Sequence, residues 1–383
     1  MAVSVPGNSV VGRLVRHQMV RAASVVALII LLVVILLVVL TRSLLSTPVD
    51  LGSVTTIPGE SDSLGVVPTP DGRHASGPSD NVVVGDTRIT VAAAIPVGAS
   101  PAGVAVTPDA RHAYVSNRNS NNVSVIDTER NIVISTIPVG ASPGAVALTS
   151  DGRRAFVPNR DSNNVSVIDT ARNSVITTIP VGASPLVVAT TPDGPYAYVP
   201  NQNSNSVSVI DTERNIVITT IPVGAGPGGV AVTPACRLAY FPNQNSNSVS
   251  VIDAALNTVA VTIPVGANPG GVAMAPDGHH AYVVNRNSNS VSVIDTTRNT
   301  VAVTISVGIN PGGVAVSPDG RHTYVANQNS SNVSVIDLVN NTVIATIPVG
   351  ANPGGVAITK DSDHAYIPNQ NSNNVTVIES STS

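Results

Sequence analysis

The stretch GVAVTPDARHAYVSNRNSNNVSVIDTERNIVISTIPVG, residues 103–140, decides the fold because it contains four short apolar runs separated by turn residues. The runs 103–107, 112–116, 122–126 and 132–137 are rich in Val, Ile and Ala and show no sustained helical period. Pro, Asp, Asn and Gly stand between the runs, as is usual where a chain reverses direction. The stretch therefore predicts four antiparallel strands.

The same unit occurs seven times at an interval of 42 residues. The glycines that end the Val-Gly phrase are Gly98, Gly140, Gly182, Gly224, Gly266, Gly308 and Gly350. An aromatic residue and, three positions later, an asparagine keep the same interval, from Tyr114 and Asn117 to Tyr366 and Asn369. A four-stranded unit in such an array is typical of a β-propeller. We expect an all-β fold, a seven-bladed β-propeller of four-stranded antiparallel blades over residues 88–383.

The two ends of this array complement each other. The last unit stops after its third strand, residues 374–379, whereas a strand-like run at 88–95 precedes the first unit. Pairing these segments leaves no open sheet edge. We expect residues 88–95 to complete the last blade, with Ile89, Val91, Ala93 and Ile95 on one buried face.

An apolar run near the N-terminus predicts one transmembrane helix before the propeller. Residues 22–40 carry no charge, and a helix of that length spans roughly 28 Å, close to the ~30 Å of a hydrocarbon core. Because Arg13, Arg16 and Arg21 precede the run, residues 1–21 are expected in the cytoplasm and the propeller outside it. A cleaved signal peptide is the alternative, although the run is long for one and residues 41–45 lack a small-residue cleavage pattern.

Residues 41–87 are rich in Ser, Pro, Gly and Asp, as expected of a stalk. Within them, residues 69–75 copy the first turn of the repeat and residues 81–86 echo its third strand. We interpret this segment as a stalk that contains a decayed repeat. A genuine eighth blade is the alternative.

Composition argues against several classes of partner and site. Lys and Arg total 19 against 23 Asp and Glu, whereas nucleic-acid binding normally requires a basic face. The single cysteine, Cys236, rules out an intramolecular disulfide framework and Cys-rich metal sites.

The loops between second and third strands supply the candidate binding residues. In a propeller these loops share one face with the connections between blades, and this face is expected to be nearly uncharged. The opposite face carries most charges, such as Asp109, Arg111 and Asp127. The candidates are Asn117, Asn119, Asn159, Asn201, Asn203, Asn243, Asn245, Asn285, Asn287, Asn327, Asn329, Asn369 and Asn371. The alternative is that these asparagines serve hairpin geometry, since Asn tolerates the left-handed conformation.

No catalytic residue, metal site or cofactor is predicted. The histidines of the second strands share one repeat position: His112, His280, His322 and His364. Because they belong to different blades, they are expected to lie too far apart to bind one metal ion. The Val-Ile-Asp carboxylates are dispersed in the same way and are interpreted as turn caps. The innermost strands carry Ala at their centre, from Ala105 to Ala357, and Lys360 alone breaks their uncharged pattern.

These phrases resemble the YVTN-repeat, YncE-like β-propeller family. The phrase that names the family reads Tyr114-Val-Ser-Asn117, Tyr198-Val-Pro-Asn201 and Tyr366-Ile-Pro-Asn369 in this chain, and the match covers residues 88–380. The resemblance implies a seven-bladed extracytoplasmic domain. It implies no single activity, since members and neighbours include lactonase-like propellers, the propellers of cytochrome and nitrous-oxide reductases, and a DNA-binding case.

Together these features predict a membrane-tethered binding scaffold at the cell surface without catalysis of its own. Its expected partners are the membrane, through residues 22–40, and an extracellular protein, peptide or glycan. A lactonase-like hydrolase is the first alternative, and an accessory propeller of an electron-transfer system is the second.

Overall fold

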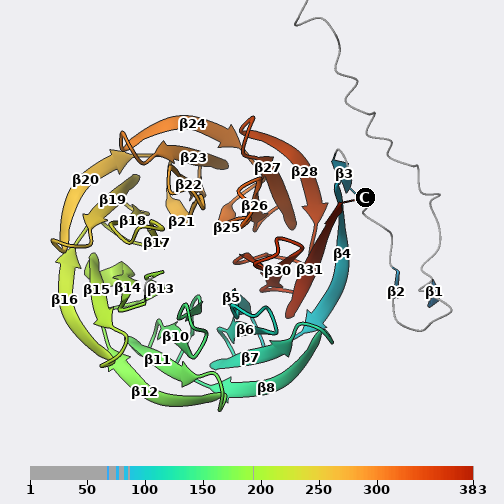
Figure 1. The fold of residues 1–383 in the computed structure, drawn as a ribbon, viewed down its shortest axis with the longest axis horizontal. Helices are drawn as coiled ribbons and strands as arrows, with labels where there is room; N and C mark the ends of the chain where they lie inside the picture. The colour runs from blue at the N-terminus through green and yellow to red at the C-terminus, as the bar shows by residue number, and fades with distance from the viewer. Residues whose placement is uncertain (1–66, 69–74, 77–81, 85–86, 193, 383) are drawn as a thin grey trace, which may run out of the picture. The chain divides into compact units, whose positions relative to one another are not determined.

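The computed structural model describes residues 67–68, 75–76, 82–84, 87–192 and 194–382. Within them, seven β-sheets stand around a central axis, each with its innermost strand at the axis and its outermost strand at the rim (Figure 1). All strand pairs within these sheets are antiparallel. The prediction of an all-β seven-bladed propeller is therefore confirmed.

Blade 1 consists of β5 (Pro101–Val106), β6 (His112–Asn117), β7 (Asn122–Asp127) and β8 (Ile132–Pro138). Blade 2 has β9 (Ala147–Leu148), β10 (Arg154–Asn159), β11 (Asn164–Asp169) and β12 (Ser174–Pro180). Blade 3 has β13 (Ala189–Thr190), β14 (Tyr196–Asn201), β15 (Ser206–Asp211) and β16 (Ile216–Pro222). Blade 4 has β17 (Ala231–Val232), β18 (Leu238–Asn243), β19 (Ser248–Asp253) and β20 (Thr258–Pro264). Blade 5 has β21 (Pro269–Met274), β22 (His280–Asn285), β23 (Ser290–Asp295) and β24 (Thr300–Ser306). Blade 6 has β25 (Pro311–Val316), β26 (His322–Asn327), β27 (Asn332–Asp337) and β28 (Thr342–Pro348).

Blade 7 is built from both ends of the propeller sequence. Its strands are β29 (Ala357–Ile358), β30 (His364–Asn369), β31 (Asn374–Thr382), β4 (Thr87–Pro96) and β3 (Val82–Val84). In the β31–β4 pair, Asn374 lies opposite Pro96 and Thr382 opposite Thr87. The strand expected at residues 88–95 thus lies within β4, and it closes the ring of blades.

Part of the segment interpreted as a stalk also forms strands. The short strand β3 extends blade 7 to five strands, and β1 (Val67–Pro68) pairs with β2 (Ala75–Ser76) as a two-stranded sheet. Among the residues that the structure describes, no further sheet stands where an eighth four-stranded blade is needed.

A β-bulge changes the expected face of β4. Val377 lies opposite Ala93 whereas Ile378 lies opposite Val91, so one extra residue in β4 reverses the alternation of side chains. Ile95 is buried at 2% exposure, but Val91 is 42% exposed. The prediction that Val91 shares a buried face with Ile95 is therefore wrong. The same shift occurs between Val125 and Ile126 of blade 1, so the bulge belongs to the repeat.

The core consists of apolar layers between neighbouring blades. In the layer between blades 1 and 2, Tyr114 and Val125 pack with Val157 and Ile168. The closing layer has the same composition, with Tyr366 and Val377 of blade 7 in one cluster with Val115 and Ile126 of blade 1. Since a large buried aliphatic side chain stabilises by about 1.5–3 kcal/mol, the contacts between blades contribute much of the stability.

The predicted transmembrane helix at 22–40 and the cytoplasmic tail at 1–21 lie outside the described residues. The part of the chain that is described contains one helical turn, η1 (Gln202–Ser204), and no helix long and apolar enough to cross a bilayer.

Candidate functional site

The first asparagine of each loop between second and third strands is buried inside its blade. These residues have 0% exposure: Asn117, Asn159, Asn201, Asn243, Asn285, Asn327 and Asn369. In blade 1, Asn117 Nδ2 donates hydrogen bonds to Asn122 Oδ1 at 2.8 Å and Ser124 Oγ at 2.9 Å. A Cβ on Gly98 would lie 2.6 Å from Asn117 Cγ, so only glycine can pack against this amide. The placement of these seven as surface binding residues is corrected, because they fasten the loop from within.

The second asparagine of the loop faces solvent. The exposed members are Asn119, Asn203, Asn245, Asn287, Asn329 and Asn371. In blade 2, Asp161 takes this position. The Asn119 N–H donates to the Ala99 carbonyl at 3.1 Å, which places the loop beside the connection between blades. Their exposed amides are available to a ligand, and their binding role stays a prediction.

The fifth residue of the loop, Asn121 in blade 1, serves hairpin geometry. Asn121 adopts φ 53°, the left-handed region that Asn tolerates. Its Oδ1 accepts a hydrogen bond from the Ser142 N–H at 2.9 Å, which ties blade 1 to the connection into blade 2. The same bond, from the Ser100 N–H to Asn373 Oδ1 at 2.9 Å, joins blade 7 to blade 1.

The residue between the first two asparagines lines the central channel, a feature that the repeated loop pattern did not reveal. We call these seven residues the mouth ring: Arg118, Arg160, Gln202, Gln244, Arg286, Gln328 and Gln370. With the starts of the innermost strands they border a cavity of about 500 Å³. The prediction of a nearly uncharged face is wrong here, because three of the seven blades place an arginine at this position.

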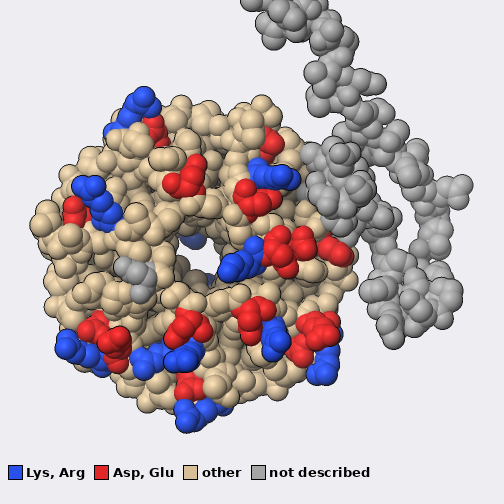
Figure 2. Space-filling model, viewed as in Figure 1, with Lys and Arg blue, Asp and Glu red and all other residues tan. Residues whose placement is uncertain are grey.

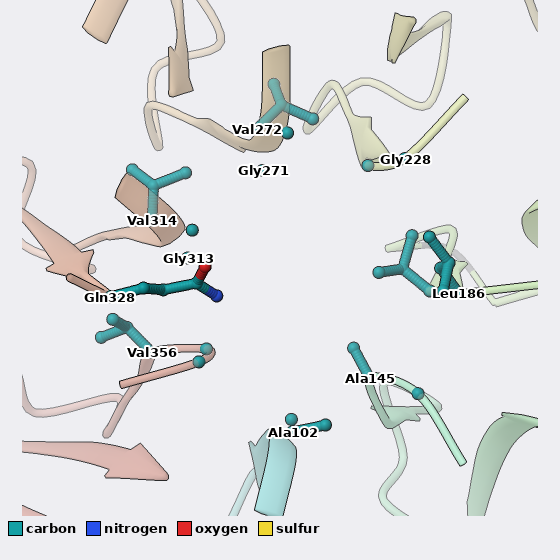
Figure 3. Close-up of a pocket in the computed structure, with 18 of the residues that line it drawn as sticks. Ala102, Ala145, Leu186, Gly228, Gly271, Val272, Gly313, Val314, Gln328 and Val356 are labelled. Carbon is teal, nitrogen blue, oxygen red and sulfur yellow. The ribbon is translucent and has the colours of Figure 1, made fainter. Parts of the chain in front are cut away.

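Small residues on the innermost strands make room for the mouth ring. A Cβ on Gly270 would lie 2.7 Å from Arg286 Nε, and one on Gly312 would lie 2.6 Å from Gln328 Nε2. In blades 4 to 7 the long polar side chain therefore lies across a glycine toward the axis, whereas blades 1 and 3 carry Ala102 and Leu186 at that position. Figure 3 shows Gln328 extending toward the open centre, with Leu186 across from it.

The mouth-ring arginines have no carboxylate partner among the described residues, since none of the ion pairs found there includes them. Burial, and then the charge of Arg160, lowers the pKa of Arg118, while Asp161 acts in the opposite direction. Burial, and then the charge of Arg118, lowers the pKa of Arg286. Blades 1 and 5 stand across the channel from each other (Figure 1), and Arg118 and Arg286 line the same cavity.

Hydrogen bonds orient the glutamines of the ring. Gln202 Nε2 donates to Gln244 Oε1 at 2.8 Å. Asn310 Nδ2 donates to Gln328 Oε1 at 3.1 Å, and the equivalent bond in blade 7 reaches Gln370 Oε1 at 3.2 Å. The oxygens of Gln328 and Gln370 each accept one of these bonds, and their amide N–H groups can still donate to a ligand.

The opposite face is built from charged turns. Figure 2 shows acidic and basic side chains next to each other around the face in view, with the channel open at its centre. Arg172 pairs with Asp169 at 2.7 Å and Arg298 with Asp295 at 2.6 Å. In blade 1, Asp127 Oδ1 accepts hydrogen bonds from two backbone N–H groups of its own turn, at 3.0 and 2.9 Å. These carboxylates act as turn caps, as interpreted from the sequence.

Two histidines on this face line one cavity at the junction of blades 7 and 1. His112 and His364 line one cavity of about 320 Å³ together with Asp127 and Asp361. The two histidines belong to adjacent blades, and the expectation that equivalent histidines lie too far apart to bind one metal ion stays a prediction. Among the described residues, no three His, Cys, Asp or Glu side chains are grouped so that they could hold a metal ion.

Fold and channel define the chain as a seven-bladed β-propeller with arginines at one channel mouth. The family model of YNCE-like β-propellers matches residues 79–196, and the model of seven-bladed lactonase propellers matches residues 218–343. Among solved structures, a hydrazine synthase chain from Kuenenia stuttgartiensis is similar, with 26% identity and a TM-score of 0.68 over 74% of this chain and 96% of that one. No curated protein matches significantly. The resemblance to YncE-like propellers is thus confirmed over residues 79–196.

Proposed function

We propose that this protein is a membrane-tethered binding module whose propeller lies outside the cytoplasm and engages a protein, peptide or glycan at the channel mouth. The observation that carries the proposal is the mouth ring, seven long polar side chains around a cavity of about 500 Å³. Ligand pockets commonly measure roughly 300–1,000 Å³. The six exposed asparagines of the same loops add amide groups that can both donate and accept hydrogen bonds.

The near identity of the blades favours binding over catalysis. The exposed asparagine is the same in six of seven loops, and its neighbours Asn117 to Asn369 are the same in all seven. Catalysis usually requires two or three different groups held at one reacting bond. A ring of repeated amides offers many equivalent contacts instead, which suits a ligand with repeated hydroxyl or peptide groups.

A matched pair of substitutions in blade 4 tests which face binds. Asn245 lies in the loop at the channel mouth and Ala255 in a turn of the opposite face, and both are exposed. We expect the full-length protein to bind members of a glycan and peptide array, Asn245→Lys to weaken that binding, and Ala255→Lys to leave it unchanged. Equal effects of the two variants, or an array without hits, would contradict the proposal.

The tether rests on residues 22–40 and on the arginines that precede them. The positive-inside tendency places Arg13, Arg16 and Arg21 in the cytoplasm and the propeller on the other side. Protease added to intact cells, or to spheroplasts where there is an outer membrane, should remove the propeller. Protection of residues 88–383 until lysis would show that the orientation is wrong.

A lactonase-like hydrolase is the second candidate, and the family match over residues 218–343 favours it. Hydrolysis of members of a lactone panel by the full-length protein with added divalent metal ions would support it and displace the binding module. The accessory role in electron transfer draws on the likeness to the hydrazine synthase chain. Co-purification of a redox protein with the full-length chain would support that role.

A further inference from the structure

We propose that the mouth ring binds a small, multiply charged oxyanion, either an organic di- or tricarboxylate or a small polyphosphate. This inference deepens the proposed function, because it rests on the channel mouth as the binding site and names the chemistry of the group that enters it.

The charges of the mouth ring differ from those of the rest of the propeller. On the opposite face, Arg130, Arg172, Arg214 and Arg298 each pair with an aspartate three residues earlier. No ion pair among the described residues involves a mouth-ring arginine. The chain has more acidic than basic residues, so carboxylates are not scarce. Their near absence at this mouth leaves a local excess of positive charge.

Two of these arginines also hold unused donors. The Nε atoms of Arg160 and Arg286 are buried and have no hydrogen-bond partner among the described atoms. A buried donor without a partner is costly, and more so when it carries charge. Both side chains are only half-buried and line the cavity, so a ligand oxygen can offset that cost by binding the part of each guanidinium group that faces the cavity, as carboxylate and phosphate commonly do.

The arrangement around the channel favours more than one negative charge on the ligand. Arg118 and Arg160 come from adjacent blades, whereas Arg286 comes from blade 5 across the channel. An anion with a single charged group can balance one side of this space. An anion with charged groups at both ends can reach both sides, and the amide N–H groups of Gln328 and Gln370 can bind its remaining oxygens.

One carboxylate, Asp161, partly offsets the positive charge of the mouth ring. Asp161 is exposed, and its charge only partly opposes the lowering of the Arg118 pKa by burial and by Arg160. It is the only acidic residue among the loops between second and third strands in the part of the chain that is described. Three arginines against one aspartate leave the mouth positively charged.

The natural alternation of Arg and Gln provides the test variant. Replacing Arg118, Arg160 and Arg286 by Gln gives every blade the residue that four blades already have. A control variant, Arg130→Gln with Arg172→Gln and Arg298→Gln, removes the same charge from the opposite face. Isothermal titration of the full-length protein in detergent with citrate, pyrophosphate and neutral erythritol then measures binding.

We expect citrate or pyrophosphate to bind the native protein and the control variant, at least tenfold weaker binding to the triple mouth variant, and no binding of erythritol. Tighter binding of citrate would identify a carboxylate ligand, and tighter binding of pyrophosphate a phosphate ligand. Gln328→Arg, which adds a fourth arginine, should tighten binding, a gain that a misfolded variant cannot imitate. The melting temperature of the triple mouth variant should not be lower than that of the native protein, because its substitutions relieve repulsion between like charges.

Two results would overturn the anion site: no binding of either anion to the native protein, or equal binding to the native protein and the triple mouth variant. Tighter binding to the triple variant would overturn it as well. The proposed function has its own test. Anion binding together with an array that shows no hits would refute the surface partner and keep the anion site, whereas array hits without anion binding would do the reverse.

Discussion

Neighbouring residues of one loop belong to the blade interior and to the channel mouth, and they differ in how much they vary between blades. Asn159 is buried in blade 2 and occurs at its repeat position seven times, whereas Arg160 lies at the channel and alternates with Gln. Each buried asparagine packs in its own copy of the same environment, so the same residue is needed in every blade. The seven mouth residues share one space, so they form a single site and can differ.

The first test concerns the blade interior as a closed ring, where we expect the largest effect. Deleting residues 1–97 removes β4 as well as the N-terminal segment, whereas deleting 1–80 keeps β3 and β4. Without β4, β31 becomes an open edge and the closing layer loses Ile95. Losing the buried side chains and strand pairing of β4 should cost several kcal/mol, at ~1.5–3 kcal/mol for each large aliphatic residue, out of a typical total of about 5–15 kcal/mol.

Thermal unfolding and solution size of the two truncated proteins measure this difference. We expect the longer deletion to melt at a much lower temperature and to aggregate through its open edge. Equal melting temperatures and two monodisperse monomers would show that the last blade closes in another way.

The second test compares the two neighbours directly. Asn159→Ala removes hydrogen bonds of 2.8 Å to Asn164 and 2.8 Å to Ser166 in a buried site, and it should destabilise by about 2–3 kcal/mol. Arg160→Gln should change the free energy of unfolding by less than ~0.5 kcal/mol, or raise it slightly. Urea unfolding of both variants measures the two effects, and a larger loss for Arg160→Gln would invalidate the division into interior and mouth.

The third test uses pH to probe the layers between blades. Burial raises the pKa of five tyrosines to about 12: Tyr114, Tyr240, Tyr282, Tyr324 and Tyr366. Because their pKa in the unfolded chain is near ~10, their contribution is fully present below that pH and is lost as pH rises toward 12.

Phe156 holds the equivalent position in blade 2, so Tyr282→Phe provides a tolerated variant. Compared with the native protein, it should lose about one fifth less stability between pH 10 and pH 12, since one of five tyrosines no longer ionises. Denaturant unfolding at several pH values, with tyrosinate absorbance, measures the slope. An identical slope in the variant would mean that Tyr282 is not protected by its layer.

The smallest effect is expected at the exposed turns of the opposite face. The hydrogen bond from Thr149 Oγ1, at 2.6 Å, lowers the pKa of Asp151. Its stabilising effect is therefore present above the ordinary aspartate pKa and is lost as pH falls below it. Asp151→Asn should lower the melting temperature at pH 7 by only about 1–2 °C, and calorimetry at pH 2 should show no difference. A large decrease at pH 7 would show that the turns contribute as much as the interior.

The local sequence pattern was sufficient to predict the strands, their number in each blade, the seven blades and the segment that closes the ring. Apolar runs and turn residues act over a few positions, and seven copies of one pattern leave little room for another fold. The local pattern also identified the turn-capping aspartates.

Packing between the blades, in contrast, sets which polar residues are buried and which of them lie close together. Asn117 and Asn119 look alike in the loop sequence, but packing against Gly98 buries the first and leaves the second in solvent. The change between Arg and Gln at the mouth-ring position is visible in the sequence. That these residues form one site depends on the channel, which brings together side chains 42 or more residues apart. The cavity that His112 and His364 both line depends on neighbouring blades, and the outward turn of Val91 depends on the bulge, because contacts between distant segments are set by packing and not by local pattern.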